Sequence, residues 1–445
     1  MTNRMKSPFV CKTRYAKLLR SSRNKKIKKS KKTKTNSQED GGGDGNLTPV
    51  QFFNSLLEND SQIISTGKIN SVTKEFFAEF FKKFQAVDFQ MPVLKKQKKY
   101  KRSRKELFDH INPQLREGVE RQMESTFKYS VDIGRPIDII ISVNSKDEGE
   151  VTKYIKMIVF WLQIVTQYTT KTTCSDKLSI YLMLSDLKKV LQSPECSSEG
   201  QCIIKKTSVN TGFSNKCSHI VIYRKEEWFK VFIHETIHNY GLDFAFMRQY
   251  EEENILKYFG ITSNKFQVRL YEAYTESWAR IMNALICAFN AEHDNFDRFM
   301  VLADRNIQLE RLNAYFQTAK ILKYMKLSMD NLADYNEETS NLSYYFIVCM
   351  LYSNYQDYIL WCRNNNDGNI LQFNVTNDDQ QKKFLDYIKK SNESDIFRKN
   401  LDYFSENILK NKDLNLYLRT YMKKSLLNEM GILELKFLDG RMGER

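Results

Sequence analysis

The segment "FIHETIHNYG", residues 232–241, carries two of the five histidines in this 445-residue chain. His234 and His238 are four positions apart and enclose Glu235. On an α-helix, residues i and i+4 project from one face about one turn apart, so both imidazoles can reach one tetrahedral Zn²⁺. With this spacing, the glutamate between them is placed to act as general base on a metal-activated water. The alternative is a buried helix whose two histidines form ordinary hydrogen bonds in the core.

The residues around this motif favour the metal site. The segment 225–240 has helical periodicity, and its large apolar side chains lie around most of the circumference: Trp228, Phe229, Phe232, Ile233, Ile237 and Tyr240. A helix that is apolar nearly all round lies inside a domain. The two histidines then face an interior or a cleft, where an unpaired polar group is costly and a bound metal removes that cost. Gly241 predicts the end of the helix.

A catalytic zinc needs a third protein ligand and one open position. One known arrangement takes a third histidine from the pattern HExxHxxGxxH. Here Phe244 occupies that position and cannot bind a metal, and Asp243 is one place out of register. The third ligand must therefore come from elsewhere in the chain.

The segment "VRLYEAYTESWARIMNAL", residues 268–285, offers carboxylates on a second predicted helix. Glu272 and Glu276 lie on the side opposite its main apolar stripe, next to the small Ala279, which would allow close approach to the first helix. We predict Glu272 as the third metal ligand and Glu276 as the acceptor for an N–H of a metal-bound histidine. The alternative is an exposed helix face with ordinary acidic residues.

These two motifs together resemble the gluzincin pattern of thermolysin-like and lethal-factor-like metallopeptidases. "YEAYTE" is similar to their N-E-A-x-S-D segment, with Glu272 at the ligand position, Glu276 at the Asp position and Tyr271 in place of the Asn. The resemblance covers residues 131–290, and the chain also resembles HExxH proteins of giant DNA viruses. The gluzincin resemblance implies a zincin-like fold and zinc-dependent hydrolysis of a peptide or protein substrate. Gluzincins also pair substrate with an edge strand, for which residues 208–214 are the candidate.

Gluzincins stabilise the oxyanion with a Tyr, His or Arg near the zinc. Tyr274, Tyr271 and His293 are available here, and the sequence leaves the choice among them open.

The wider pattern predicts an α+β fold that is mostly helical. Short β-branched runs at 136–143, 177–185 and 218–224 predict a small mixed sheet before the histidine-bearing helix. Helices are expected before and after this sheet. The expected segments are 49–59 (with Thr48 as N-cap), 72–85, 104–127 (broken near Pro113), 150–168, 247–259 and most of the chain beyond.

Four regions are expected along the chain. Residues 1–46 have the composition of a disordered basic tail, and 47–130 are expected to form a helical region that contains the basic run 95–105. The resemblance implies a zincin-like metallopeptidase domain at 131–330, and 331–445 are expected to form a helical C-terminal region.

The positive charge is concentrated near the N-terminus. The run 25–34 holds seven cations and the run 95–105 holds eight. Together these fifteen positive charges equal the net charge of the chain, +15. Such runs attract DNA, RNA or other polyanions, and the first also fits a solvated tail. The candidate polyanion-binding residues are Lys25, Lys26, Lys28, Lys29, Lys31, Lys32, Lys98, Lys99, Lys101 and Arg102.

Localisation is inferred from what the sequence lacks. There is no apolar signal sequence, no apolar run long enough for a bilayer, and no CxxC pair among the eight cysteines. We therefore expect reduced thiols and a protein that stays inside a cell. The resemblance to proteins of giant DNA viruses implies the cytoplasm or nucleus of a host cell, with the protein either free or packaged in a virion. A different reading is a virion structural or nucleic-acid-associated protein that keeps a peptidase fold as a scaffold. The intact Glu235 argues against it, because a scaffold needs no general base.

Overall fold

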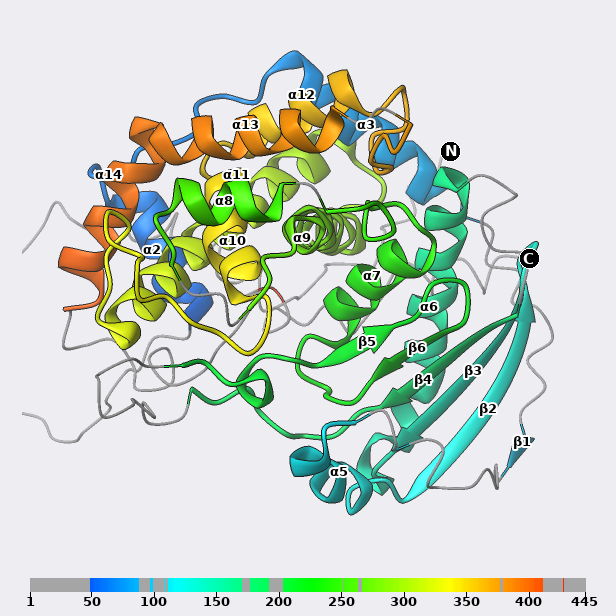
Figure 1. The fold of residues 1–445 in the computed structure, drawn as a ribbon. Helices are drawn as coiled ribbons and strands as arrows, with labels where there is room; N and C mark the ends of the chain where they lie inside the picture. Colours follow the sequence, from blue (N-terminus) through cyan, green and yellow to red (C-terminus); the bar gives the residue numbers. More distant parts are fainter. Residues whose placement is uncertain are drawn as a thin grey trace, which may run out of the picture. The chain divides into compact units, whose positions relative to one another are not determined.

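The computed structural model describes residues 49–87, 97–98, 108, 111–169, 177–191, 203–249, 251–262, 266–376, 379–410 and 427. All of them belong to one compact unit, Leu47–Arg445. Within it, a mixed sheet is followed by a largely helical half (Figure 1). The prediction of an α+β fold with a small mixed sheet is confirmed.

The sheet has six strands in the order β1-β2-β3-β4-β6-β5. Strands β3, β4 and β6 are parallel, whereas β1, β2 and β5 each run antiparallel to their neighbour. The strand bounds are β1 Gln97–Lys98, β2 Ser125–Asp132, β3 Pro136–Val143, β4 Leu178–Met183, β5 Gly212–Ser214 and β6 His219–Ile222. The three predicted strands are therefore present as β3, β4 and β6. Of the expected edge segment 208–214, only the last three residues form β5.

The central strands are apolar because both faces of the sheet are covered. Strand β3 is buried from Ile137 to its end at Val143. On one face, helices α6 (Val151–Val165) and α7 (Trp228–Asn239) pack against each other, and α7 lies against β5 and β6 (Figure 1). On the other face, a small cluster joins α5 (Pro113–Glu120) to β4 and β6 through Val119, Met183 and Val221.

The predicted helix 104–127 is wrong at its C-terminal end. Helix α5 begins at Pro113, as expected from the break, but it ends at Glu120, and residues 125–127 belong to strand β2. The strand pairs along its whole length with β3, and Thr126 and Ser142 also join their hydroxyls at 2.9 Å. The backbone pairing of a hairpin outweighs the local helical periodicity there. Residues 104–107 lie outside the described part of the chain.

The second half is helical. The predicted helices 72–85, 150–168 and 225–240 are present with small changes at their ends, and the first helix begins at Pro49 as expected. The helix predicted at 247–259 is shorter and begins only at Glu252, whereas the helix predicted at 268–285 continues to Ala291. Their bounds, and those of the remaining helices, are α2 Pro49–Asn59, α3 Ser71–Gln85, α8 Glu252–Tyr258, α9 Leu270–Ala291, α10 Phe296–Met325, α11 Val348–Ser353, α12 Tyr355–Asn365, α13 Gln380–Glu393 and α14 Asp395–Tyr403. The N-cap predicted at Thr48 lies outside the described residues.

Helix α9 is the centre of this half. It packs on α7 on one side and on α10 and α3 on others, and it is buried along nearly its whole length. Between α10 and α11 the chain forms a π-helical turn, Leu342–Ile347, which also packs on α9. Helices α12 and α13 lie above α9 and α11 in Figure 1, and α14 lies to their left, where it packs on α10 and α11. The metal-site motifs therefore lie on two helices in the middle of the unit.

Two further findings bear on the sequence expectations. No helix among the described residues is long and apolar enough to cross a membrane. Cys287, Cys349 and Cys362 are free, whereas Cys217 is disulfide-bonded. The expectation that all cysteines are reduced thiols is therefore wrong at Cys217.

Candidate metal centre

Helix α7 presents its two histidines inside the protein. Every residue of Trp228–Asn239 is buried except His238, which is partly buried. The helix ends where predicted: Tyr240 caps it and Gly241 takes the left-handed conformation at φ 66°. The apolar surface of α7 thus fixes the direction in which the polar stripe of the helix points.

Helix α9 lies against α7 and contributes the acidic side. Glu272 is 8% exposed and Glu276 is fully buried. The alternative of an exposed acidic helix face is therefore wrong. Because uncompensated carboxylates are costly in an interior, each must find positive or hydrogen-bonding partners.

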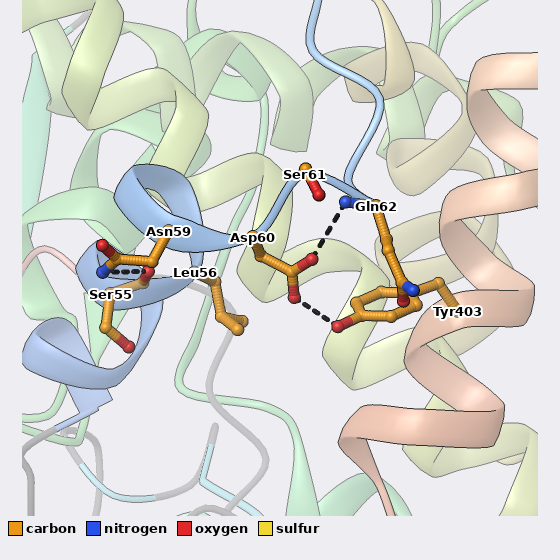
Figure 2. A pocket seen from close by; sticks show the side chains of 7 residues that line it. All are labelled: Ser55, Leu56, Asn59, Asp60, Ser61, Gln62 and Tyr403. Carbon is orange, nitrogen blue, oxygen red and sulfur yellow. Dashed lines mark hydrogen bonds between the residues drawn. The ribbon is translucent and has the colours of Figure 1, made fainter.

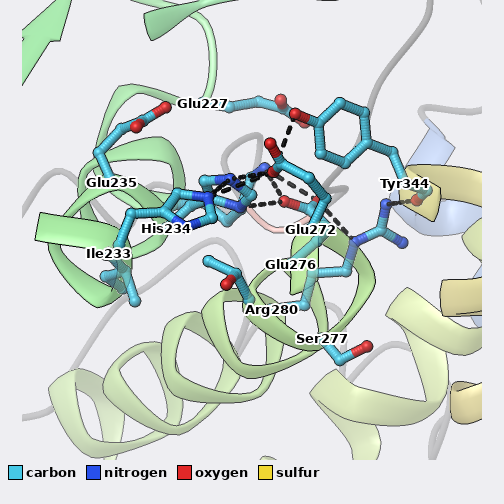
Figure 3. Close-up of polar contacts among 12 residues, drawn as sticks. Glu227, Ile233, His234, Glu235, Glu272, Glu276, Ser277, Arg280 and Tyr344 are labelled. Carbon is cyan, nitrogen blue, oxygen red and sulfur yellow. Dashed lines mark hydrogen bonds and ion pairs between the residues drawn. The ribbon is translucent and has the colours of Figure 1, made fainter. Parts of the chain in front are cut away.

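Three side-chain atoms converge between the two helices (Figure 3). Nε2 of His234 lies 3.0 Å from Nε2 of His238, and Oε2 of Glu272 lies 3.1 Å and 3.2 Å from these two nitrogens. Among the described residues, these three form a group that could hold a metal ion. Ligand atoms of a tetrahedral Zn²⁺ with bonds of about 2.0–2.2 Å lie roughly 3.3–3.6 Å apart. The three atoms fit a metal of this size after a small outward adjustment.

The second nitrogen of each histidine is held by a carboxylate. Nδ1 of His234 lies 3.1 Å from Oε2 of Glu276, and Nδ1 of His238 contacts Oδ2 of Asp243. These contacts turn both Nε2 atoms toward Glu272, which is the arrangement found around metal-binding histidines. Glu276 lies where the sequence predicts it, whereas the role of Asp243 was missed.

Asp243 follows His238 by five residues, after the turn at Gly241. Its other contacts are Thr275 Oγ1 on α9 at 3.1 Å and the Ala245 amide at 3.2 Å. An acidic residue two positions after the helix-ending glycine is a sequence feature from which this orienting role could be predicted. The HExxHxxGxxH pattern tests Asp243 only as a metal ligand.

The electrostatics of the cluster are strongly coupled. Burial lowers the pKa of His238, but Asp243 and Glu272 more than offset this, so that its pKa lies well above the usual range. Burial likewise raises the pKa of Glu272, but His238 and His234 together hold it well below the usual range. Glu272 thus supplies a carboxylate that favours its ionised form, beside a His238 imidazole whose negative neighbours attract either a proton or a metal cation.

Glu276 is fixed by two buried cations. Lys230 Nζ donates to its two oxygens at 3.0 Å and 2.9 Å, and Arg280 Nε donates to Oε1 at 2.9 Å. Lys230 and Arg280 are themselves almost fully buried. With His234 as a fourth contact, the carboxylate is occupied on both oxygens, which leaves Glu272 as the acidic group available to a metal.

Glu235 lies on the same helix and faces the sheet edge. Its Oε2 accepts a hydrogen bond of 2.7 Å from Oγ of Ser214, the last residue of β5. The carboxylate is largely buried, and the Ser214 contact anchors it to the edge strand, next to the metal-ligand candidates.

A tyrosine that the sequence did not indicate reaches the cluster. Tyr344, in the π-helical turn, donates to Oε2 of Glu272 at 3.1 Å, and its ring packs edge-on against His234 (Figure 3). Of the three earlier candidates, Tyr274 bonds to the Leu371 carbonyl, and His293 lies beside Phe289 near the other end of α9. Tyr271 contacts the cluster through its ring, which packs edge-on against His238. Nothing in the spacing links Tyr344 to α7, because it is more than 100 residues further along the chain.

The candidate polyanion-binding residues are not brought to this centre. Lys98 lies in β1 at the opposite sheet edge from β5. Lys25, Lys26, Lys28, Lys29, Lys31, Lys32, Lys99, Lys101 and Arg102 lie outside the described residues. Their assignment remains a prediction.

A separate shallow pocket lies at the end of α2 (Figure 2). Its one charged side chain, Asp60, is bonded to the Gln62 amide at 3.0 Å and to the Tyr403 hydroxyl. No imidazole, thiol or cation lines it. The chemistry of the described residues is therefore concentrated at the α7–α9 cluster.

The chain was compared with models of known protein families, with curated proteins and with solved structures, and none of them matches it.

Proposed function

We propose that His234, His238 and Glu272 bind Zn²⁺ and that the protein is a zinc-dependent peptidase. The observation that carries the proposal is the convergence of two Nε2 atoms and one carboxylate oxygen within 3.2 Å of one another in a buried position. The oriented histidines support it as well, since Glu276 and Asp243 each hold a second ring nitrogen. The ligand set of two histidines and one glutamate is that of catalytic zinc sites which keep one position open.

The residues around the cluster have the chemistry that hydrolysis requires. A bound zinc would polarise a peptide carbonyl and make an attacking water more acidic. Glu235 would take the proton from this water and pass it to the leaving amine, a role that needs an ionisable group beside the reacting atoms. Tyr344, whose hydroxyl donates to Glu272, would turn this donor to the substrate oxygen on which negative charge develops. Ser214 holds Glu235 against β5, so a substrate paired to this edge strand would lie next to the base.

The test is hydrolysis of an unfolded protein substrate by the purified full-length chain. We expect cleavage that is lost with a chelator and restored by zinc but not by magnesium. Cleavage that survives complete zinc removal would overturn the proposal. So would the absence of cleavage in protein that holds zinc.

A further inference from the structure

The loop that leads into the π-helical turn contains a buried acid, Glu337, which is 3% exposed. Its Oε2 accepts two hydrogen bonds of 2.9 Å, one from the Leu342 amide and one from the Tyr335 hydroxyl. Its Oε1 is buried without a hydrogen-bond partner. A buried carboxylate with this environment is expected to be neutral, because burial disfavours the charged form.

The contacts of Glu337 define where Tyr344 sits. Leu342 is the first residue of the π-helical turn, two residues before Tyr344. The same turn is tied to the N-terminal side of α9 by Ser343, whose hydroxyl donates to the Arg269 carbonyl at 2.8 Å. Glu337 and Ser343 thus hold the segment whose tyrosine donates to Glu272.

The described groups that act on Glu337 are hydrogen-bond donors rather than cations. Burial raises its pKa to about 8, only partly opposed by the amides of Leu342 and Asn341 and by the Tyr335 hydroxyl. Lys205 and Lys206 lie in the segment bridged to the loop at Ile204, yet neither contributes to this pKa. Burial raises the pKa of the Tyr335 hydroxyl well above its usual range, so this group stays neutral at mildly alkaline pH. Glu337 is therefore a group near this turn whose charge changes at mildly alkaline pH.

We propose that Glu337 is a positioning residue: by accepting the Leu342 amide it clamps the start of the π-helical turn and seats Tyr344 against Glu272. A negative charge on the buried carboxyl would make release of the turn easier. The inference rests on the proposed function for its effect on hydrolysis, but the clamp itself is independent of any reaction. Single π-helical turns occur frequently at functional sites of proteins.

The clamp is tested by hydrogen exchange of the segment 335–345 in wild type and Glu337→Gln. Glutamine keeps an acceptor for Leu342 and Tyr335 but cannot ionise. In the opened wild-type segment the carboxyl ionises with an ordinary pKa, so opening becomes up to about tenfold easier per pH unit between about 4.5 and 8. After correction for intrinsic exchange, we expect at least a tenfold rise in wild type from pH 6 to 8 and less than about a twofold rise in the variant. Equal pH dependence in the two proteins would overturn the clamp.

The effect on Tyr344 is tested by the pH profile of hydrolysis. Glu337→Gln should keep the wild-type rate at pH 7 and extend activity further into the alkaline range. Glu337→Ala, which orphans the Leu342 amide, should lower kcat about 10–100-fold with little change in KM and with zinc retained. Glu338→Gln, at the exposed neighbour, is the matched control and should leave the profile unchanged.

The outcomes separate this inference from the proposed function. If wild type hydrolyses nothing, the proposed function fails, and the exchange experiment alone decides the clamp. If wild type is active but Glu337→Gln has the same alkaline limb, Glu337 does not position Tyr344 and the inference is wrong.

Discussion

Glu272 and Glu276 are one helical turn apart on α9, yet their surroundings give them different roles. Glu276 is enclosed by Lys230, Arg280 and His234 and has both oxygens occupied. Glu272 directs one oxygen at both histidines and accepts a bond from Tyr344. The distinction between ligand and orienting group is therefore made by neighbours on other segments.

We predict opposite outcomes for the two glutamates. Glu272→Ala should abolish high-affinity zinc binding, because only two protein ligands remain. Glu276→Gln should cost about 10–100-fold in zinc affinity or activity while zinc still binds. Calorimetric zinc titration of both variants checks this. Metal lost from the Glu276 variant and kept by the Glu272 variant would exchange their roles.

Glu235 separates metal binding from catalysis. Glu235→Gln should retain zinc, because this residue is not one of the three converging groups, but it should lose about 10²–10⁴-fold in hydrolysis rate. Glu253→Gln, at an exposed position of α8, is the control and should behave as wild type. Loss of zinc together with activity would show that Glu235 has been given the wrong role.

Individual site residues could be predicted from the sequence where their spacing along one helix determines the geometry. The i, i+4 rule placed His234 and His238 side by side, and the register of the second helix selected Glu272. Asp243 and Tyr344 were missed because their contacts depend on a turn and on a distant π-helical segment. Neither has a periodic signature.

At the scale of elements, strand β5 depends on one glycine. A Cβ on Gly212 would lie 2.6 Å from the carbonyl oxygen of Val221 on β6 and 3.2 Å from side-chain atoms of Ile222 and of Val231 on α7. The strand can approach both neighbours only because this residue has no side chain.

Gly212→Ala should therefore displace β5 and move Ser214 away from Glu235. We expect a loss of about 1–3 kcal/mol in unfolding free energy, as for other overpacked sites, together with reduced hydrolysis. Gly149→Ala is the matched control, since a Cβ there meets nothing within 4 Å. Chemical denaturation of both variants measures the difference, and equal stability would show that β5 tolerates the shift.

Glu337 also predicts a pH-dependent stability. Its pKa is raised to about 8 in the folded protein from an ordinary value of 4.5. The unfolded chain loses this proton first, so the group's unfavourable contribution is absent below pH 4.5, grows as pH rises, and is complete above about 8. Glu337→Gln should gain stability over wild type across this window, on the order of a few kcal/mol. Urea unfolding at pH 5, 6.5 and 8 checks this, and a difference that does not grow with pH would contradict it.

Elements were predicted well where burial and periodicity agree. The apolar runs of β3 and β4 and the amphipathic pattern of α9 fall in this class. The start of strand β2 was predicted as helix, because residues 125–127 continue a helical pattern. These residues form a strand only through their pairing with β3. The π-helical turn has no sequence signal of its own.

For the whole molecule, the basic runs remain the part that the structure does not explain. The run 25–34 belongs to the unit Met1–Asn46, outside the described residues. Deleting residues 1–46 should weaken binding to DNA or RNA and reduce its salt dependence, since each lost phosphate contact removes about 0.7–0.9 from the slope. Peptide hydrolysis should persist.

Filter binding at several salt concentrations measures this effect. A full-length variant with glutamine at Lys25, Lys26, Lys28, Lys29, Lys31 and Lys32 is the matched control and should reproduce the loss of binding. If hydrolysis falls with the deletion, the tail belongs to the active unit and the boundary at residue 46 is wrong.

The central claim is that the buried cluster on α7 and α9 is a zinc site. Its most direct test is the zinc content of the purified full-length protein by elemental mass spectrometry, beside His234→Ala with its fold checked by circular dichroism. We predict one zinc per chain in wild type and none in the folded variant. A wild-type protein that contains no zinc and binds none on titration, or a His234→Ala variant that keeps it, would contradict the claim.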